Sequence, residues 1–306
     1  MKRMLPHALC EQNDSVSNSL RGRECVLCRR GVSGIKGEHV LPSWFLGEWD
    51  SAPRPFVTSL NDEPRRKRDG AIREHASLAR FQLPMCPRCN NILSERFEKR
   101  ETQRIVSRMF RGEGHFSSTE CRIAGTWTVK TWLLLAHPDT RASDPGWTTA
   151  SGAWNPMPRS LLDWMIEGSP PPDGLSIWLA KMTPALGWEP PHVMDLPRVK
   201  HDGTTTDFQV FEFGVKDIGL TLVYHPGWPI EHPFEHSRWV RRFWPHNGKE
   251  LKMETLLWFP RDAIRWRTGP RLTFHDGLYG SRPLPPIESS MEWMDLMPEF
   301  VSQITR

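Results

Sequence analysis

The sequence has no long apolar run and no repeat of fixed period, and its first residues do not predict a signal peptide. Its best candidate for a membrane segment, Trp132–Ala136, has five residues, whereas a spanning helix needs about 20. The first ten residues carry charge but lack the apolar stretch of a cleaved signal. These absences argue against membrane, secreted and repeat proteins, and they predict a cytoplasmic location without membrane partners.

Tyrosine is also scarce, with 2 residues against 15 tryptophans and 28 prolines in a chain of 306 residues. The tryptophans lie mostly after residue 120 and often stand beside proline. Because a tryptophan buries a large area, this pattern predicts an aromatic core interrupted by prolines. With 38% hydrophobic and 25% charged residues, the chain can bury such a core and is not disordered by composition.

Charge is distributed unevenly along the chain. Residues 1–112 contain 21 basic and 13 acidic side chains, a net charge of +8. Residues 113–306 contain 19 and 23, a net charge of −4. The first third is therefore a candidate for binding a polyanion, although a solvated basic face explains the same numbers.

Four of the six cysteines form two C-x-x-C pairs, Cys25/Cys28 and Cys86/Cys89. Each such turn points two thiolates at one ion, and two turns complete the tetrahedral shell of a structural zinc site. A redox dithiol is the competing interpretation. Cys10 and Cys121 belong to no such pair and are interpreted as ordinary thiols.

The residues around these pairs resemble the HNH endonucleases, the ββα-metal nucleases. In members with a zinc site, the first C-x-x-C is followed by an acidic residue, His, an apolar residue, a variable position and Pro. Here this segment is Glu38–Pro42. The second C-x-x-C then runs into His or Asn at a helix start, and here Asn90 follows Cys89. The resemblance covers about residues 20–112.

The resemblance implies a metal-dependent endonuclease that hydrolyses DNA, with RNA possible, in phage defence, restriction or a mobile element. It implies that His39 activates water as general base, while Glu38 and Asn90 hold the catalytic divalent ion. Oxygen ligands suit Mg²⁺ or Mn²⁺, so zinc on the four cysteines is expected to serve folding alone.

This sequence departs from the family pattern in three places. Glu38 stands where Asp is more common, and residues 79–85 lack the middle Asn, with Gln82 a weak candidate to replace it. The spacing from His39 to Cys86 is long, which implies an insertion near residues 50–75. The second departure favours an alternative function, a zinc-stapled module that binds nucleic acid without cutting it. Asn90 also has a structural alternative as a helix N-cap. Glu98 has three interpretations: an extension of the metal site, a solvated helix face, or a residue that orients His39.

Basic residues near the motif are candidates for binding phosphate. The densest run lies in an expected insertion near residues 50–75, and a second pair follows the first cysteine turn. These candidates are Arg65, Arg66, Lys67, Arg68, Arg29 and Arg30. Such side chains give salt-dependent affinity that is independent of sequence.

We expect an α+β fold, with an HNH-type domain over residues 20–112 and an α+β domain with a mainly antiparallel sheet over residues 122–306. The linker is placed at residues 112–121. Apolar spacing from Leu93 to Phe110 predicts helix. Further helices are expected over 122–136 and 159–167, strands over Leu175–Met182, Asp207–Phe213, Ile218–Tyr224 and Leu256–Phe259, and a loop over His201–Thr206.

Overall fold

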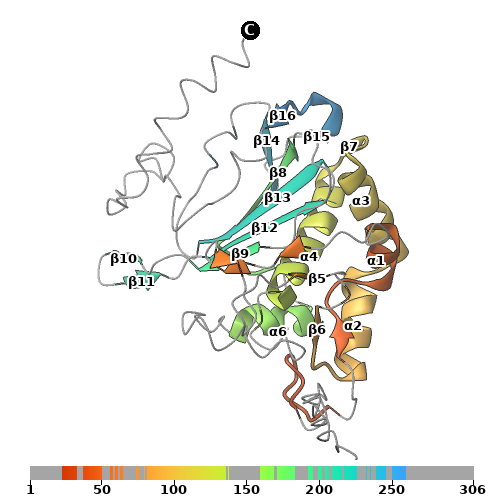
Figure 1. Cartoon of the computed structure of the whole chain (residues 1–306), viewed down its shortest axis with the longest axis vertical. Helices are drawn as coiled ribbons and strands as arrows, with labels where there is room; N and C mark the ends of the chain where they lie inside the picture. Colours follow the sequence, from red (N-terminus) through yellow and green to blue (C-terminus); the bar gives the residue numbers. More distant parts are fainter. Residues whose placement is uncertain are drawn as a thin grey trace, which may run out of the picture.

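The structure is a computed structural model of the whole chain (Figure 1). The residues that it describes are 23–32, 37–49, 56–57, 59–60, 63–64, 74–75, 79, 81–135, 137, 159–168, 171–182, 192–195, 199–201, 204–206, 209–215, 217–225, 232, 235, 239–245 and 250–259. A search of these residues for a helix long and apolar enough to span a bilayer finds none.

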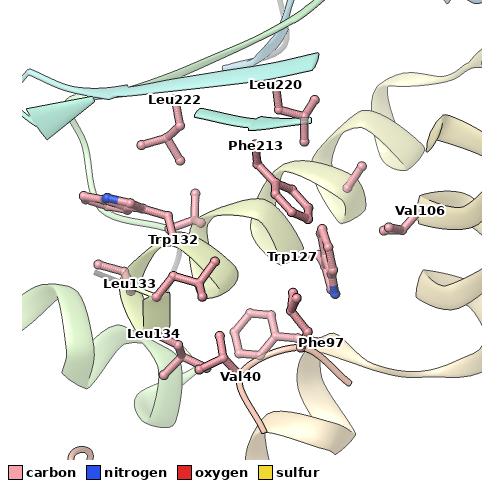
Figure 2. Packing of buried hydrophobic residues seen from close by; sticks show 14 of the residues in the cluster. Val40, Phe97, Val106, Trp127, Trp132, Leu133, Leu134, Phe213, Leu220 and Leu222 are labelled. Carbon is pink, nitrogen blue, oxygen red and sulfur yellow. The ribbon is translucent and has the colours of Figure 1, made fainter. Parts of the chain in front are cut away.

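Five α-helices are described, and α4 is the central one. Their bounds are α1 Ser43–Trp49, α2 Pro87–Phe97, α3 Arg100–Arg111, α4 Ser118–Leu135 and α6 Arg159–Glu167. Nearly every residue of α4 from Ala124 onward is buried, so this helix has no solvated face over its second half. Figure 2 shows Leu220 and Leu222 of the sheet on one side of α4, and Val40 and Phe97 on the other.

The expected α+β architecture and mainly antiparallel sheet are confirmed. Strands β14, β8, β13, β12, β9, β3 and β4 lie in that order, with β16 also paired to β8. Their bounds are β14 Val240–Trp244, β8 Leu175–Met182, β13 Ile218–Tyr224, β12 Gln209–Val215, β9 His192–Asp195, β3 Ser59–Leu60, β4 Glu63–Pro64 and β16 Trp258–Phe259. The parallel pairs are β16–β8 and β3–β9.

Four smaller antiparallel pairs complete the strands. They are β1 Glu38–His39 with β6 Gln82–Leu83, β2 Phe56–Val57 with β5 Glu74–His75, β7 His115–Phe116 with β15 Leu251–Lys252, and β10 Val199–His201 with β11 Thr204–Thr206. The expected loop over His201–Thr206 is wrong at both ends, because His201 lies in β10 and Thr204–Thr206 form β11.

One continuous cluster of buried side chains joins the N-terminal part to the sheet. Within it, Phe45 of α1, Phe110 of α3, Trp127 of α4 and Phe213 of β12 form mutual ring contacts with centroids 5.5–6.1 Å apart. These contacts mean that the two regions predicted from the sequence share a core. A change in α4 therefore affects both.

Close packing of α4 on β14 depends on a glycine. A Cβ atom at Gly125 would lie 2.7 Å from the ring of Trp244, nearer than real contacts allow. The helix itself begins with a capping box, because Glu120 accepts the Ser117 backbone N–H at 3.0 Å and Ser117 Oγ accepts the Glu120 N–H at 3.3 Å. This box places the helix start within the expected linker.

The helical stretch after the second C-x-x-C consists of two helices rather than one. The helix α2 starts at Pro87 with Cys86 as N-cap, so Asn90 lies inside its first turn and is not the cap. It ends at Phe97 with Glu98 as its C-cap, and α3 begins after Lys99, whose ψ of 157° is extended. The same apolar spacing continues across the break because both helices pack on α4.

Candidate functional site

The two cysteine turns are held together by backbone hydrogen bonds. In the first, the Cys25 N–H donates to the Arg30 carbonyl at 2.7 Å, and the Arg29 N–H donates to the Cys25 carbonyl at 2.8 Å. The Val26 N–H then donates to the Pro84 carbonyl at 3.0 Å, which joins this turn to the chain entering the second. The local turns therefore bring residues more than fifty positions apart into contact.

The four thiols of Cys25, Cys28, Cys86 and Cys89 form one cluster. All four Sγ atoms lie within 4.8 Å of one another, and those of Cys28 and Cys86 are 3.6 Å apart. A tetrahedral site with zinc–sulfur bonds of about 2.3 Å requires sulfur–sulfur distances of about 3.8 Å. The donor set and its spacing therefore fit a metal ion such as zinc, as the sequence predicted.

The protonation of these thiols is strongly interdependent. Burial raises the pKa of the Cys25 thiol, and burial together with the neighbouring thiols raises that of Cys89. Burial also acts to raise the pKa of Cys28, but hydrogen bonds from the Arg30 backbone and the other thiols outweigh it and lower the value to about 7. Full ionisation of the cluster thus needs a cation, which is the role of a thiolate-bound metal.

A carboxylate and an amide meet beside this cluster. Asn90 Nδ2 donates a hydrogen bond of 3.0 Å to Glu38 Oε2, across 52 residues of sequence. Glu38 lies on β1, which pairs with β6, and Asn90 lies in the first turn of α2. Both side chains are half-buried. With Nδ2 engaged by the carboxylate, Asn90 Oδ1 and the two Glu38 oxygens are the atoms suited to a hard cation.

His39 follows Glu38 on the same strand and is exposed. Its register partner is Gln82, whose Nε2 donates to the Ala79 carbonyl at 3.4 Å. Successive strand residues point to opposite faces, so the strand alone does not aim His39 at the Glu38 carboxylate. The two-residue strand ends at His39, and the following Val40 N–H donates to the Phe81 carbonyl at 2.9 Å.

Of the predicted basic residues, the structure describes Arg29 and Arg30. Arg29 and Arg30 are exposed at the end of the first cysteine turn, and Arg88 is exposed within the second. Arg29 has a φ of 60°, a left-handed conformation that is uncommon for a side-chain-bearing residue. The run Arg65–Arg68 lies outside the described residues.

Three buried or half-buried cations near the site were not predicted from the sequence. Arg96 of α2 donates to the carbonyls of Trp164 and Met165 at the end of α6, at 3.0 and 2.7 Å. Arg159 of α6 donates to the carbonyls of Val26, at 3.0 Å, and Leu27. Lys130 of α4 pairs with Glu98, so this carboxylate is engaged by a buried cation.

The Arg159 contact leads to a prediction about metal retention. Arg159→Met removes both bonds to the turn that carries Cys25 and Cys28, so zinc is expected to bind roughly tenfold more weakly, about 1.4 kcal/mol. Competition with a chromogenic zinc chelator measures the change. Arg104→Met on the exposed face of α3 removes the same charge and is expected to leave zinc affinity unchanged. Equal zinc affinities in the two variants would show that Arg159 does not hold the first cysteine turn in place.

Comparisons with protein-family models, curated proteins and solved structures find no significant match to this chain.

Proposed function

We propose that this protein is a metal-dependent HNH-type endonuclease that hydrolyses phosphodiester bonds in DNA. The observation that carries the proposal is the contact between Glu38 of β1 and Asn90 of α2, the helix that also carries Cys89 of the four-cysteine cluster. β1 pairs antiparallel with β6 and α2 follows β6, with α1 and four short strands between β1 and β6; this supports the ββα arrangement that the resemblance implies.

The donor atoms support two metal sites with different tasks. Four sulfurs suit zinc, which would tie the two cysteine turns together for folding. Glu38 and Asn90 offer oxygens that suit Mg²⁺ or Mn²⁺, which would neutralise charge on the phosphate and on the leaving 3′ oxygen. The Asn90–Glu38 hydrogen bond fixes the carboxylate in advance, so little ordering remains when the ion binds.

His39 supplies the proton acceptor. Its exposure leaves the imidazole accessible to water and to a DNA backbone. In its neutral form, one ring nitrogen can take the proton of the attacking water as the oxygen–phosphorus bond forms. Gln82, opposite His39, hydrogen-bonds the Ala79 carbonyl within the segment that lacks the family's middle Asn.

The exposed arginines of the two cysteine turns are proposed to bind the phosphate backbone. A variant with Arg29, Arg30 and Arg88 changed to Gln is expected to reduce the slope of log affinity against log salt by up to about 2.7, at about 0.9 per phosphate contact. Fluorescence anisotropy with a labelled duplex measures the slope. The control changes Arg100, Arg104 and Arg122, which are exposed on α3 and α4. A larger slope change in the control would place the DNA elsewhere.

The second candidate function is a zinc-stapled module that binds nucleic acid without cutting it. Gln82 in place of the family's Asn favours this alternative, because the substitution falls directly opposite the proposed base. Both functions require the four-cysteine cluster and the exposed arginines. Strand cleavage alone separates them.

Incubation of the purified chain with supercoiled plasmid tests the choice between the two functions. The endonuclease is expected to produce nicked or linear DNA in Mg²⁺ or Mn²⁺. A short treatment with EDTA is expected to stop this cleavage. Zinc content is measured before and after EDTA, so that loss of the structural metal is recognised. Salt-sensitive DNA binding without strand breaks in either metal would favour the binding module.

A further inference from the structure

A fully buried lysine connects α4 with both parts of the proposed active site. The side chain of Lys130 is 1% exposed, and its ammonium makes an ion pair with Glu98 Oε1 at 2.7 Å. The same nitrogen donates to the Val40 carbonyl at 3.2 Å. Glu98 lies at the C-terminal end of α2, the helix of Asn90, and Val40 directly follows His39.

Stability alone is a poor reason to have this charge in the core. Removing an ammonium group from water is costly, and a buried ion pair is often no more stabilising than apolar side chains of similar size. The residues around Lys130 on α4, from Val129 to Leu135, are themselves buried, so an apolar residue would suit the local environment. The polar contacts of Lys130 therefore point to a role in geometry.

Both backbone polar groups of Val40, which belong to the two successive peptide groups after His39, are hydrogen-bonded. Its N–H donates to the Phe81 carbonyl of the chain entering β6, and its carbonyl accepts from Lys130. The backbone next to His39 is thus fixed relative to β6 and to α4 together. Glu98, held by the same ammonium and by Ser94 Oγ at 3.3 Å, fixes the end of α2.

We propose that Lys130 is a positioning residue that fixes the position of His39 relative to Asn90. It does so by joining β1, the strand of His39, to α2, the helix of Asn90. This inference rests on the proposed endonuclease function. Lys130 is too deeply buried to touch DNA, so it acts through the Val40 peptide and Glu98. It follows that α4, outside the region of the family resemblance, is part of the active-site framework.

Two variants separate the positioning contact from the ion pair. Glu98→Gln removes the carboxylate charge that compensates the buried ammonium, but it keeps an oxygen that accepts from Lys130 and leaves the Val40 contact in place, so kcat is expected to fall less than in the double variant. Lys130→Met with Glu98→Gln also removes the Val40 contact without leaving an unpaired charge. This double variant is expected to lower kcat for plasmid nicking roughly 10- to 100-fold at unchanged KM, with unchanged zinc content.

A readout that needs no catalysis accompanies the kinetics. Amide hydrogen exchange of a peptide containing His39–Leu41 is expected to be faster in the double variant than in Glu98→Gln. If the wild type does not cut DNA, the proposed function fails, and the exchange comparison still decides whether Lys130 holds the strand.

Equal kcat and equal exchange in the two variants would overturn the proposal. If the double variant does not fold, Lys130→Gln with Glu98→Gln replaces it, because the Gln amide fills the space but falls one bond short of the Val40 carbonyl. The same loss of kcat and of protection is then expected. Retention of both would show that Lys130 only fills the core.

Discussion

Cys89→Ser is expected to lose the bound zinc and to lower the melting temperature by roughly 10 °C. The Cys89 thiol is 2% exposed and one of four that share the cluster. A serine oxygen is a poor zinc ligand, and a structural zinc site supplies much of the folding free energy of the segments it joins. Loss of about 4 kcal/mol would account for this shift in a chain of this size. Metal analysis and thermal denaturation followed by circular dichroism measure both effects.

Cys121→Ser is the matched control for this variant. Cys121 is also buried, at 1% exposed, but it lies on α4 outside the cluster, and its Sγ contacts the Phe116 carbonyl at 3.9 Å. A serine hydroxyl retains a donor for that carbonyl. We expect one zinc per chain and a small decrease in melting temperature. Full zinc content in Cys89→Ser, or equal loss of zinc in both variants, would refute the four-cysteine site.

Glu38→Gln is expected to reduce the rate of DNA cleavage about 10²- to 10³-fold. The change keeps the size of the side chain and an oxygen that accepts from Asn90, but it removes the negative charge that we propose holds the divalent ion. Charge stabilisation by such an ion contributes several kcal/mol to phosphodiester hydrolysis, and each 1.4 kcal/mol is about tenfold in rate. Rates of plasmid nicking at several Mg²⁺ and Mn²⁺ concentrations measure the effect.

Glu95→Gln controls for the loss of one charge near the site. Glu95 is exposed on α2, the helix that carries Asn90. This control is expected to keep the wild-type rate and the wild-type dependence on Mg²⁺. If Glu38→Gln cuts DNA as fast as this control does, Glu38 does not bind the catalytic ion.

Local sequence patterns were sufficient for the elements that depend on local chemistry. The helix over 159–167 and the strand over 175–182 have the bounds that were expected, because Pro and Gly delimit both. The four-cysteine cluster follows from spacing alone, since each C-x-x-C turn forms half of the site wherever it lies in the chain.

Contacts between distant parts of the chain were beyond prediction from a single sequence. Lys130 stands in an apolar stretch of α4, which signals a buried partner, but no local pattern identifies that partner as Glu98. In the same way, the bonds from Arg159 to the first cysteine turn join residues more than 130 positions apart. The early start of α4 is a different case, because the Ser117–Glu120 capping box is a local pattern that the sequence itself contains.

The most direct test of the central claim compares the wild type with His39→Ala in a time course of supercoiled plasmid nicking in Mg²⁺ or Mn²⁺. Both proteins must first be shown to hold one zinc per chain and to melt at similar temperatures. If His39 is the general base, the wild type cuts DNA and the variant does so about 10²- to 10⁴-fold more slowly. Equal rates in the two proteins, or DNA that stays intact with the zinc-loaded wild type, would contradict the endonuclease site.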